Sequence, residues 1–153
     1  RYRAKIVDFP FIVRWIHVSE IKVKDYIVLT DRLYTDTDEW IKVTDDVAVI
    51  GITDYAQKKL KDIVGIELPE VGKKVKKGEA IGVIESIKAT ADVYAPISGE
   101  VIEVNEKLLD SPELINNDPY GDGWIVKIKI EDKSELDKLL KPQEYANKIE
   151  KEE

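Results

Sequence analysis

Lys88 is a candidate for a reactive side chain at a defined position. It lies within the stretch ESIKA, residues 85–89. This stretch is a polar gap between two apolar runs, AIGVIES and TADVYAP, which predict the two strands of a hairpin. The tip, residues 87–89, would then lie in solvent, where the lysine amine is open to other molecules. Most exposed lysines are only solvated charges, so the turn alone does not assign Lys88 a function.

Other kinds of chemistry find little support in the sequence. The chain has no Cys, which excludes disulfides, thiolate metal sites and a cysteine nucleophile. Any sulfur chemistry must therefore come from a bound group. The G-x-G-x-x-G, P-loop and H-E-x-x-H motifs of nucleotide and metal sites are absent as well. The sequence thus offers no recognisable catalytic constellation.

A repeated pattern flanks the ESIKA stretch. PEVGKKV, residues 69–75, recurs as PISGEVI, residues 96–102, and both follow the pattern Pro-x-x-Gly-x-x-apolar. Two interlocked sheets that clamp the hairpin between them would explain the repeat. Chance is the alternative, because Pro and Gly recur in any β protein.

The remaining segments predict short strands with small helices at the margins. Thr53 can cap a helix, because its hydroxyl can accept a hydrogen bond from the first helical turn. Ser134 and Pro142 are residue types that begin helices. The expected elements are a hairpin of WIKV and VAVIGI (40–52), a helix DYAQKKL (54–60), a strand IVGIEL (63–68), a helix PELIN (112–116), a strand WIVKIKI (124–130), and helices after Ser134 and Pro142.

Length and charge narrow the class of protein. A chain of 153 residues is enough for one domain with its own core. Its net charge of −7 argues against nucleic acid as a partner, because neutralising phosphates requires a basic face. No apolar run approaches the 18 or more residues of a membrane span. We therefore expect a globular protein with neither nucleic acid nor membrane as a partner.

Six stretches of the chain closely resemble the H protein of the glycine cleavage system, a family of lipoyl carriers. The resemblance covers roughly residues 30–150 without a large gap. Its E-S-x-K-A core differs from the D-K-A tip of 2-oxoacid dehydrogenase lipoyl domains and from the M-K-M tip of biotin carriers. The six stretches are YTDTDEW (34–40), VAVIGITDYAQ (47–57), IVGIELPEVG (63–72), KKGEAIGVIESIKAT (76–90), SGEVIEVN (98–105) and NNDPYGDGWIVKIKI (116–130).

The resemblance implies that Lys88 carries lipoate in amide linkage. A lipoate ligase, or an octanoyl transferase followed by a sulfur-inserting enzyme, would attach it. Acylation takes place inside another enzyme, so the lysine must project from a rigid scaffold that this enzyme can enclose. Glu85 and Ser86 would belong to the surface that the modifying enzyme recognises, and the small Ala89 would leave room beside the lysine.

The implied function is that of a carrier, and not of an enzyme. The lipoyl arm would shuttle the aminomethyl group of glycine from a pyridoxal-phosphate glycine decarboxylase to a tetrahydrofolate-dependent aminomethyltransferase. A dihydrolipoamide dehydrogenase with FAD would then reoxidise the arm. By the same resemblance we expect a cytoplasmic monomer.

Position in the family motif also implies a groove in which the arm docks. Thr37, Glu39, Lys59 and Asp92 would line this groove, where carboxylates and hydroxyls can hydrogen-bond an ammonium group and shield it from water. The ordinary alternatives are a turn residue for Thr37 and solvated charges for Glu39 and Asp92. The chain departs from the family at Asp38, where many members have histidine, and at Lys59, which is histidine in some.

Other functions stay open. An H-like lipoyl protein can act as a sulfur carrier or as a lipoate relay in another pathway. A biotin carrier domain fits less well, because Ile87 and Ala89 stand where such carriers have methionines. A binding module without any modification is a third alternative, and it predicts no added mass.

We expect a mainly β barrel-sandwich hybrid of the lipoyl/biotinyl type, with an N-terminal hairpin and small flanking helices. Residues 1–33 would form an N-terminal extension of uncertain structure, 34–133 the carrier domain and 134–153 a C-terminal helical segment. The extension reflects either a misassigned start, with Val18 as one candidate, or an added segment of real structure. The expected core residues are Val49, Ile63, Val64, Ile66, Val75, Ile81, Val83, Val101, Ile125 and Val126, with Leu139 and Leu140 seating the last helices.

Overall fold

The computed structural model describes residues 3–8, 12–17 and 19–152, with side chains from residue 19 onward. Among these residues, no helix has the length and apolar character needed to cross a membrane. The elements in chain order are β1 (Arg3–Asp8), β2 (Ile12–His17), β3 (Glu20–Val23), β4 (Tyr26–Leu29), β5 (Leu33–Tyr34), β6 (Glu39–Thr44), β7 (Val47–Ile52), α1 (Asp54–Leu60), β8 (Ile63–Glu67), β9 (Lys74–Val75), β10 (Ala80–Ser86), β11 (Thr90–Tyr94), β12 (Gly99–Val104), α2 (Lys107–Asp110), α3 (Leu114–Asn117), β13 (Val126–Ile130), the 3₁₀ helix η1 (Lys133–Lys138) and α4 (Pro142–Glu150).

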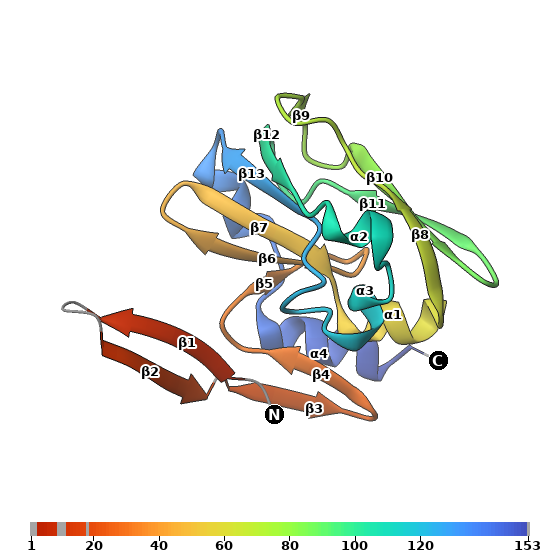
Figure 1. The fold of residues 1–153 in the computed structure, drawn as a ribbon. Coiled ribbons are helices and arrows are strands. Elements are labelled where there is room, and N and C mark those ends of the chain that lie inside the picture. The colour runs from red at the N-terminus through yellow and green to blue at the C-terminus, as the bar shows by residue number, and fades with distance from the viewer. Residues whose placement is uncertain (1–2, 9–11, 18, 153) are drawn as a thin grey trace.

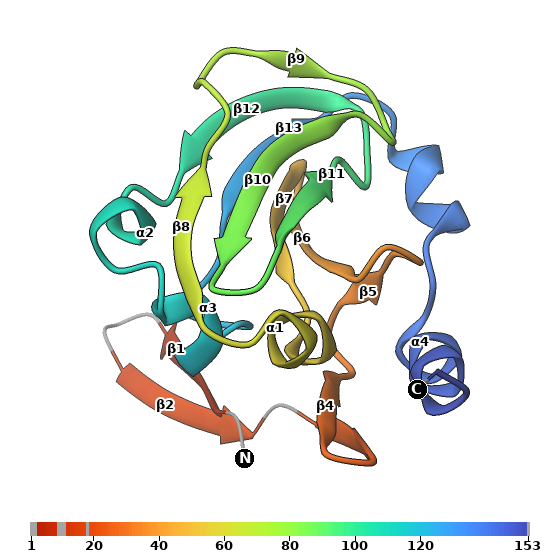
Figure 2. The ribbon, with the colours of Figure 1, turned by 90° about the vertical axis from the view of Figure 1, so that its right-hand side faces the viewer.

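Two facing sheets build the body of the molecule (Figure 2). One has six strands in the order β5-β6-β7-β13-β12-β9, and the other has three in the order β11-β10-β8. Two further antiparallel pairs, β1–β2 and β3–β4, lie N-terminal to them in the chain. The prediction of a mainly β sandwich with an N-terminal hairpin and small helices is confirmed.

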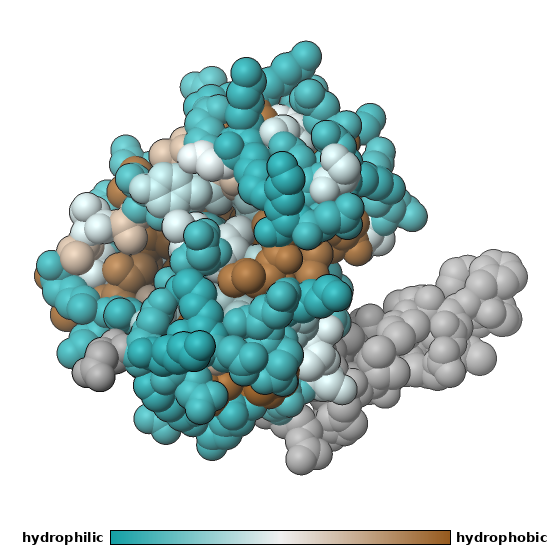
Figure 3. Space-filling view, turned by 180° about the vertical axis from the view of Figure 1, so that it is seen from behind, coloured by the Kyte–Doolittle hydropathy of each residue, from teal (hydrophilic) through white to brown (hydrophobic). Residues whose placement is uncertain are grey.

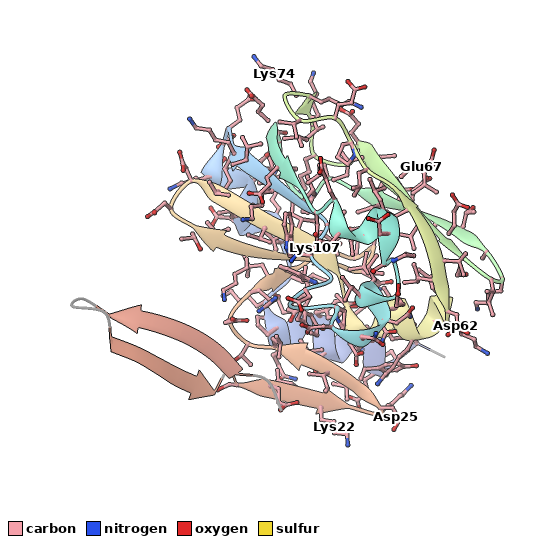
Figure 4. All side chains as sticks on the ribbon, viewed as in Figure 1. Lys22, Asp25, Asp62, Glu67, Lys74 and Lys107 are labelled. Atoms are coloured by element: carbon pink, nitrogen blue, oxygen red, sulfur yellow. The ribbon has the colours of Figure 1, made fainter. Side chains whose placement is uncertain are left out.

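The main core lies between the two facing sheets, and strand β13 shows how the sequence forms it. Val126, Ile128 and Ile130 are buried, whereas Lys127 and Lys129 between them are not. Successive side chains of a strand point to opposite faces, so this alternation turns one apolar face inward. Charged side chains project outward from several elements (Figure 4), and Figure 3 shows hydrophilic residues over most of one face of the molecule, with apolar patches between them.

A second hydrophobic cluster joins the β3–β4 hairpin to the C-terminal helix. Val28 and Leu29 of β4 are buried in it together with Tyr145 and Ile149 of α4. Figure 1 shows α4 running beside this hairpin, and Trp40 of β6 completes the cluster from the six-stranded sheet. The aromatic cluster therefore fastens the β3–β4 hairpin and the C-terminal helix to the sandwich.

The expected core is largely present, but Val64 was predicted wrongly because its side chain is 56% exposed. The cause is a bulge between β8 and β10: Gly65 pairs with Glu85, and the next pair joins Ile63 to Ser86. Val64 is thus an extra residue that escapes the alternation. Three expected core residues, Val49, Val83 and Leu140, are half-buried, and those that are buried are Ile63, Ile66, Val75, Ile81, Val101, Ile125, Val126 and Leu139.

The expected helix after Thr53 is confirmed, since the Thr53 hydroxyl accepts a hydrogen bond from the Ala56 N–H at 3.1 Å. The region around PELIN differs from its prediction. An unpredicted helix, α2, precedes it, and α3 begins only at Leu114. The strand expected from Trp124 begins at Val126, because Trp124 closes a turn in which its N–H donates to the carbonyl of Gly121 at 3.0 Å.

The two repeats around the ESIKA stretch pair with each other. Gly99 is the register partner of Val75, in the antiparallel pair β9–β12. Just beyond this pair, the Gly72 N–H donates to the carbonyl of Val101 at 2.7 Å, and the Val101 N–H donates to that of Lys73 at 2.9 Å. The two repeats are therefore paired with each other at the edge of the six-stranded sheet.

Candidate functional site

Strands β10 and β11 form a hairpin whose turn carries Lys88. Glu85 is the register partner of Thr90, and residues 87–89 follow the last paired position of β10. The turn projects from the edge of the molecule in Figure 1, and the side chain of Lys88 is exposed. The structure therefore has the hairpin tip that the sequence predicts.

Ser86 organises this turn through its hydroxyl group. The hydroxyl oxygen accepts hydrogen bonds from the N–H groups of Lys88 at 3.3 Å and Ala89 at 3.1 Å, and the hydroxyl donates to the Ala89 carbonyl at 3.1 Å. On the other side, the Ile87 N–H donates to the carbonyl of Asp62 at 3.0 Å. Figure 4 labels Asp62, which lies where α1 leads into β8. The base of the lysine is thus held from both sides.

The three residues expected to be recognised by a modifying enzyme lie around this base. Glu85 and Ala89 are exposed, and Ser86 is half-buried because its hydroxyl turns into the loop. Ile87, at the tip, has 68% of its surface in solvent. Single exposed apolar residues are common on protein surfaces, so Ile87 alone does not assign a function to the tip.

A pocket of 240 Å³ beside the hairpin brings together all four residues expected to line a groove. The segment before β6, helix α1 and strand β11 form its walls. Its polar lining consists of Thr37, Asp38, Glu39, Lys59 and Asp92, and its apolar lining of Ile52, Ala56, Leu60, Ile84 and Ala91.

Glu39 is a buried carboxyl group, with 1% of its surface exposed. The hydroxyls of Thr35 and Thr37 donate to its Oε1, and the Tyr94 N–H donates to its Oε2 at 3.1 Å. Burial raises the pKa of Glu39 to about 7, and these hydrogen bonds act in the opposite direction. Its charge therefore changes near neutral pH.

Asp38 adds a second carboxyl group to the pocket, in an unusual backbone conformation. Its φ of +73° lies in the left-handed region, which few residues other than glycine adopt. Its carbonyl accepts the Thr53 N–H at 3.0 Å, and its Oδ1 accepts the Tyr145 hydroxyl at 2.9 Å. Burial raises the pKa of Asp38. Nothing in the sequence pattern singled out Tyr145.

Lys59 places a cation at the rim of the pocket. Its Nζ donates to the Tyr55 hydroxyl at 3.1 Å and lies 5.2 Å from the centre of that ring. The hydrogen bond from Lys59 to Tyr55 raises the pKa of Lys59. Lys59 therefore offers a positive charge at the mouth of a pocket whose inner groups are carboxyls.

The pocket combines an apolar lining with carboxyl groups, and this suits a flexible apolar chain that ends in a cation. No group of three His, Cys, Asp or Glu residues in the part of the chain with described side chains could hold a metal ion. A second cavity, of 550 Å³, lies on the other side of Thr37 and Glu39. Glu39 thus stands between two hollows, close to the hairpin that carries Lys88.

Comparison with known proteins gives one consistent answer. The model of the family described as "Glycine cleavage H-protein" matches residues 32–152. A probable glycine cleavage system H protein of Aeropyrum pernix is 61% identical over 136 residues, which are 88% of this chain and 95% of that protein. The glycine cleavage system H protein of Thermotoga maritima is 57% identical over 114 residues, which are 74% of this chain and 92% of that protein.

A solved structure agrees with these relatives. The crystal structure of a glycine cleavage system H protein from Mycobacterium marinum superimposes with a TM-score of 0.71 at 38% sequence identity. The similarity covers 78% of this chain and 97% of that one.

Proposed function

The chain belongs to the glycine cleavage H-protein family, and we propose on this premise that it is the lipoyl carrier of a glycine cleavage system, with lipoate in amide linkage to Lys88. The observation that carries the proposal is the position of Lys88. Its amine projects from a turn held on both sides by hydrogen bonds of Ser86 and Ile87, beside a pocket with carboxyl groups. A solvated lysine without a function would need neither the fixed base nor the pocket.

The described residues fit a lipoyl group. Four residues of chain, or no more than about 13 Å, separate Lys88 from Asp92 at the pocket rim, and an acylated lysine side chain can span this distance. Ile52, Ile84 and Leu60 would contact the hydrocarbon part of the arm. When attached, lipoate supplies a dithiolane whose sulfur can accept the aminomethyl group that remains when glycine loses carbon dioxide.

The carboxyl groups of the pocket would hold the ammonium end of that cargo. Glu39 and Asp92 would accept hydrogen bonds from it, and the apolar lining would keep water away. Because the pKa of Glu39 is about 7, this attraction would weaken as the pH falls below neutral. Asp92 is exposed at the rim, so it would meet the cargo first.

The proposed partners are the enzymes that load, unload and reoxidise the arm. They are glycine decarboxylase with pyridoxal phosphate, aminomethyltransferase with tetrahydrofolate, and dihydrolipoamide dehydrogenase with FAD. A lipoate ligase or an octanoyl transferase would modify Lys88, contacting Glu85, Ser86 and Ala89 around it. A projecting turn serves all of them, since each must draw the same arm into its own active site.

Two measurements test the proposal. The intact mass of protein purified from its native source should exceed the mass of the chain by one lipoyl group, located on Lys88 by peptide mapping. The lipoylated protein should then support exchange of bicarbonate into glycine by a glycine decarboxylase. An unmodified Lys88 would contradict lipoyl attachment. A lipoylated protein without exchange would contradict the assignment to glycine cleavage and favour a sulfur carrier or a lipoate relay.

A further inference from the structure

We infer that Tyr145, on the C-terminal helix α4, is a positioning residue that holds two walls of the arm pocket in register. The inference rests on the proposed function, because it assigns Tyr145 a role in docking the arm. The structural link itself is a property of the unmodified chain. It begins at helix α1 and ends at the carboxyl group of Asp38.

A directed chain of hydrogen bonds makes this link. The Ala56 N–H donates to the Thr53 hydroxyl oxygen at 3.1 Å, the Thr53 and Tyr145 hydroxyls lie 2.7 Å apart, and Tyr145 donates to Asp38 Oδ1 at 2.9 Å. Because the Tyr145 hydroxyl donates to Asp38, its single proton points to Asp38. The proton of Thr53 must therefore point to Tyr145.

The two ends of this chain belong to different walls of the pocket. Asp38 directly precedes Glu39 and has a positive φ, so its conformation depends on contacts such as this one. Thr53 is the N-cap of α1, and α1 brings Ala56, Lys59 and Leu60 into the pocket. One phenol hydroxyl thus joins the carboxyl-bearing wall to the helical wall.

The ring of Tyr145 is itself fixed in place. Tyr145 has no exposed surface, and its ring stacks on that of Tyr34 with centroids 4.6 Å apart and planes 5° apart. The same helix reaches α1 a second time, because Glu152 beyond its end accepts the Tyr55 hydroxyl at 2.6 Å. Helix α4 therefore holds α1 from two points, although it contributes no residue to the lining of the pocket.

Tyr34 provides a matched control. Its ring is as buried as that of Tyr145 and stacks on it, but its hydroxyl donates to the carbonyl of Leu29 at 2.7 Å, away from the pocket. Tyr145→Phe and Tyr34→Phe each remove one buried phenol hydroxyl from the same stack. Any effect that comes from general loosening of the cluster should appear in both variants.

The first test uses the unlipoylated protein. In Tyr145→Phe, NMR titration should show the pKa of Asp38 raised above its wild-type value, because the carboxylate loses a donor. The other charged groups that influence Asp38 are Glu39 beside it, Lys59 on α1, Lys148 on α4 and Glu152 beyond it, and both variants keep them. Amide exchange at Ala56 should also become about tenfold faster. Tyr34→Phe should change neither quantity.

The second test uses the lipoylated and loaded protein. Tyr145→Phe should lose its aminomethyl cargo to water about tenfold faster than Tyr34→Phe, although both variants are lipoylated to the wild-type extent. If Tyr145→Phe matches Tyr34→Phe in the Asp38 pKa and in Ala56 exchange, the inference is wrong. If wild-type protein cannot be lipoylated, the proposed function fails, whereas the results on the unmodified chain still decide whether the link exists.

A second variant covers the case in which Tyr145→Phe does not fold. Asp38→Asn keeps an oxygen acceptor and a residue type that tolerates positive φ, but it makes the hydrogen bond from Tyr145 neutral and so weaker. It should speed Ala56 exchange relative to the wild type, by less than the factor of about ten expected for full loss of the hydrogen bond. Unchanged exchange in Asp38→Asn would overturn the inference.

Discussion

Lys88→Arg separates the structural role of this position from its chemical one. The substitution keeps the positive charge and most of the stem at an exposed site, so the free energy of unfolding should change by no more than about 0.5 kcal/mol. Lipoylation should be lost, because a guanidinium stays protonated and cannot form the lipoyl amide. Thermal melting and intact mass after incubation with a lipoate ligase measure the two effects.

Lys77→Arg is the matched control, since Lys77 is also exposed and near the start of a β-hairpin. It should melt like Lys88→Arg and still gain the mass of lipoate. If Lys88→Arg also gains that mass, the attachment site lies elsewhere.

Ser86→Ala tests whether the turn must be held for Lys88 to be modified. The substitution removes the acceptor of the Lys88 and Ala89 N–H groups, so the free energy of unfolding should fall by about 1 kcal/mol. The rate of lipoylation should fall, because the lysine no longer projects from a fixed base. Ser86→Thr keeps the hydroxyl and should retain most of the rate, whereas equal rates in both variants would show that the hydroxyl is dispensable.

Glu39→Gln tests the buried carboxyl group through the dependence of stability on pH. The pKa of Glu39 is about 7 in the folded protein and 4.5 in its ordinary state. Between these values the folded state binds more protons than the unfolded state, so the free energy of unfolding falls as the pH rises. From pH 4.5 to 7.5 this group should lower the free energy of unfolding of the wild type by on the order of 3 kcal/mol.

Urea denaturation at several pH values checks the sign. Glu39→Gln should flatten the fall in stability over this range, even if its amide fits less well against the Tyr94 N–H and lowers stability at every pH. Asp38, whose pKa is also raised, keeps its carboxyl group in both proteins, and the loss of the Glu39 charge beside it removes a repulsion that raises its pKa, which flattens the curve in the same direction. Parallel curves would contradict the raised pKa of Glu39.

At the scale of elements, Gly82→Ala tests how closely β10 approaches β8. A Cβ on Gly82 would lie 2.8 Å from the carbonyl oxygen of Glu67, so the strands would have to move apart. We expect a loss of about 1–3 kcal/mol in the free energy of unfolding. Gly65→Ala is the control on the neighbouring strand, because the nearest atom to its Cβ would be 3.7 Å away. Urea denaturation should show Gly65→Ala within about 1 kcal/mol of the wild type.

The elements also show what the sequence could predict. Local signals found the ESIKA hairpin, the capped helix after Thr53 and the alternating strand β13, because each depends on residues close in the chain. Val64 was misplaced because a bulge depends on the partner strand and leaves little trace in the bulged strand itself. The role of Tyr145 was out of reach for the same reason, since its hydrogen bond to Asp38 joins residues far apart in sequence.

The groove residues Thr37, Glu39, Lys59 and Asp92 came from resemblance to a family, and no periodicity indicates them. The structure brings these four residues to one pocket, whereas their roles there stay predictions. The division of the chain at residues 33 and 133 also stays a prediction. The structure shows a contact that the sequence did not predict. Val28, from the predicted N-terminal extension, is buried in one cluster with residues of the C-terminal helix.

At the scale of the whole molecule, Ile149→Ala tests whether the second cluster is part of the cooperative fold. Ile149 has no exposed surface and packs with β4 and the aromatic residues, so its truncation should cost about 2–4 kcal/mol. Leu109→Ala is the control, because Leu109 is 59% exposed on α2 and should change stability by no more than about 0.5 kcal/mol. Calorimetry should show one transition in both variants, and a separate early transition in Ile149→Ala would mean that α4 unfolds on its own.

Three strand pairs, β7–β13, β9–β12 and β10–β11, join residues that lie on opposite sides of the turn at 87–89. Because exposed turns tolerate a break in the chain, two fragments divided at this turn should assemble into the same fold by complementation. Lys88 then becomes the first residue of the C-terminal fragment. Chemical synthesis of that fragment could place any chosen acyl group on the side chain of Lys88, so that the arm is introduced without a modifying enzyme.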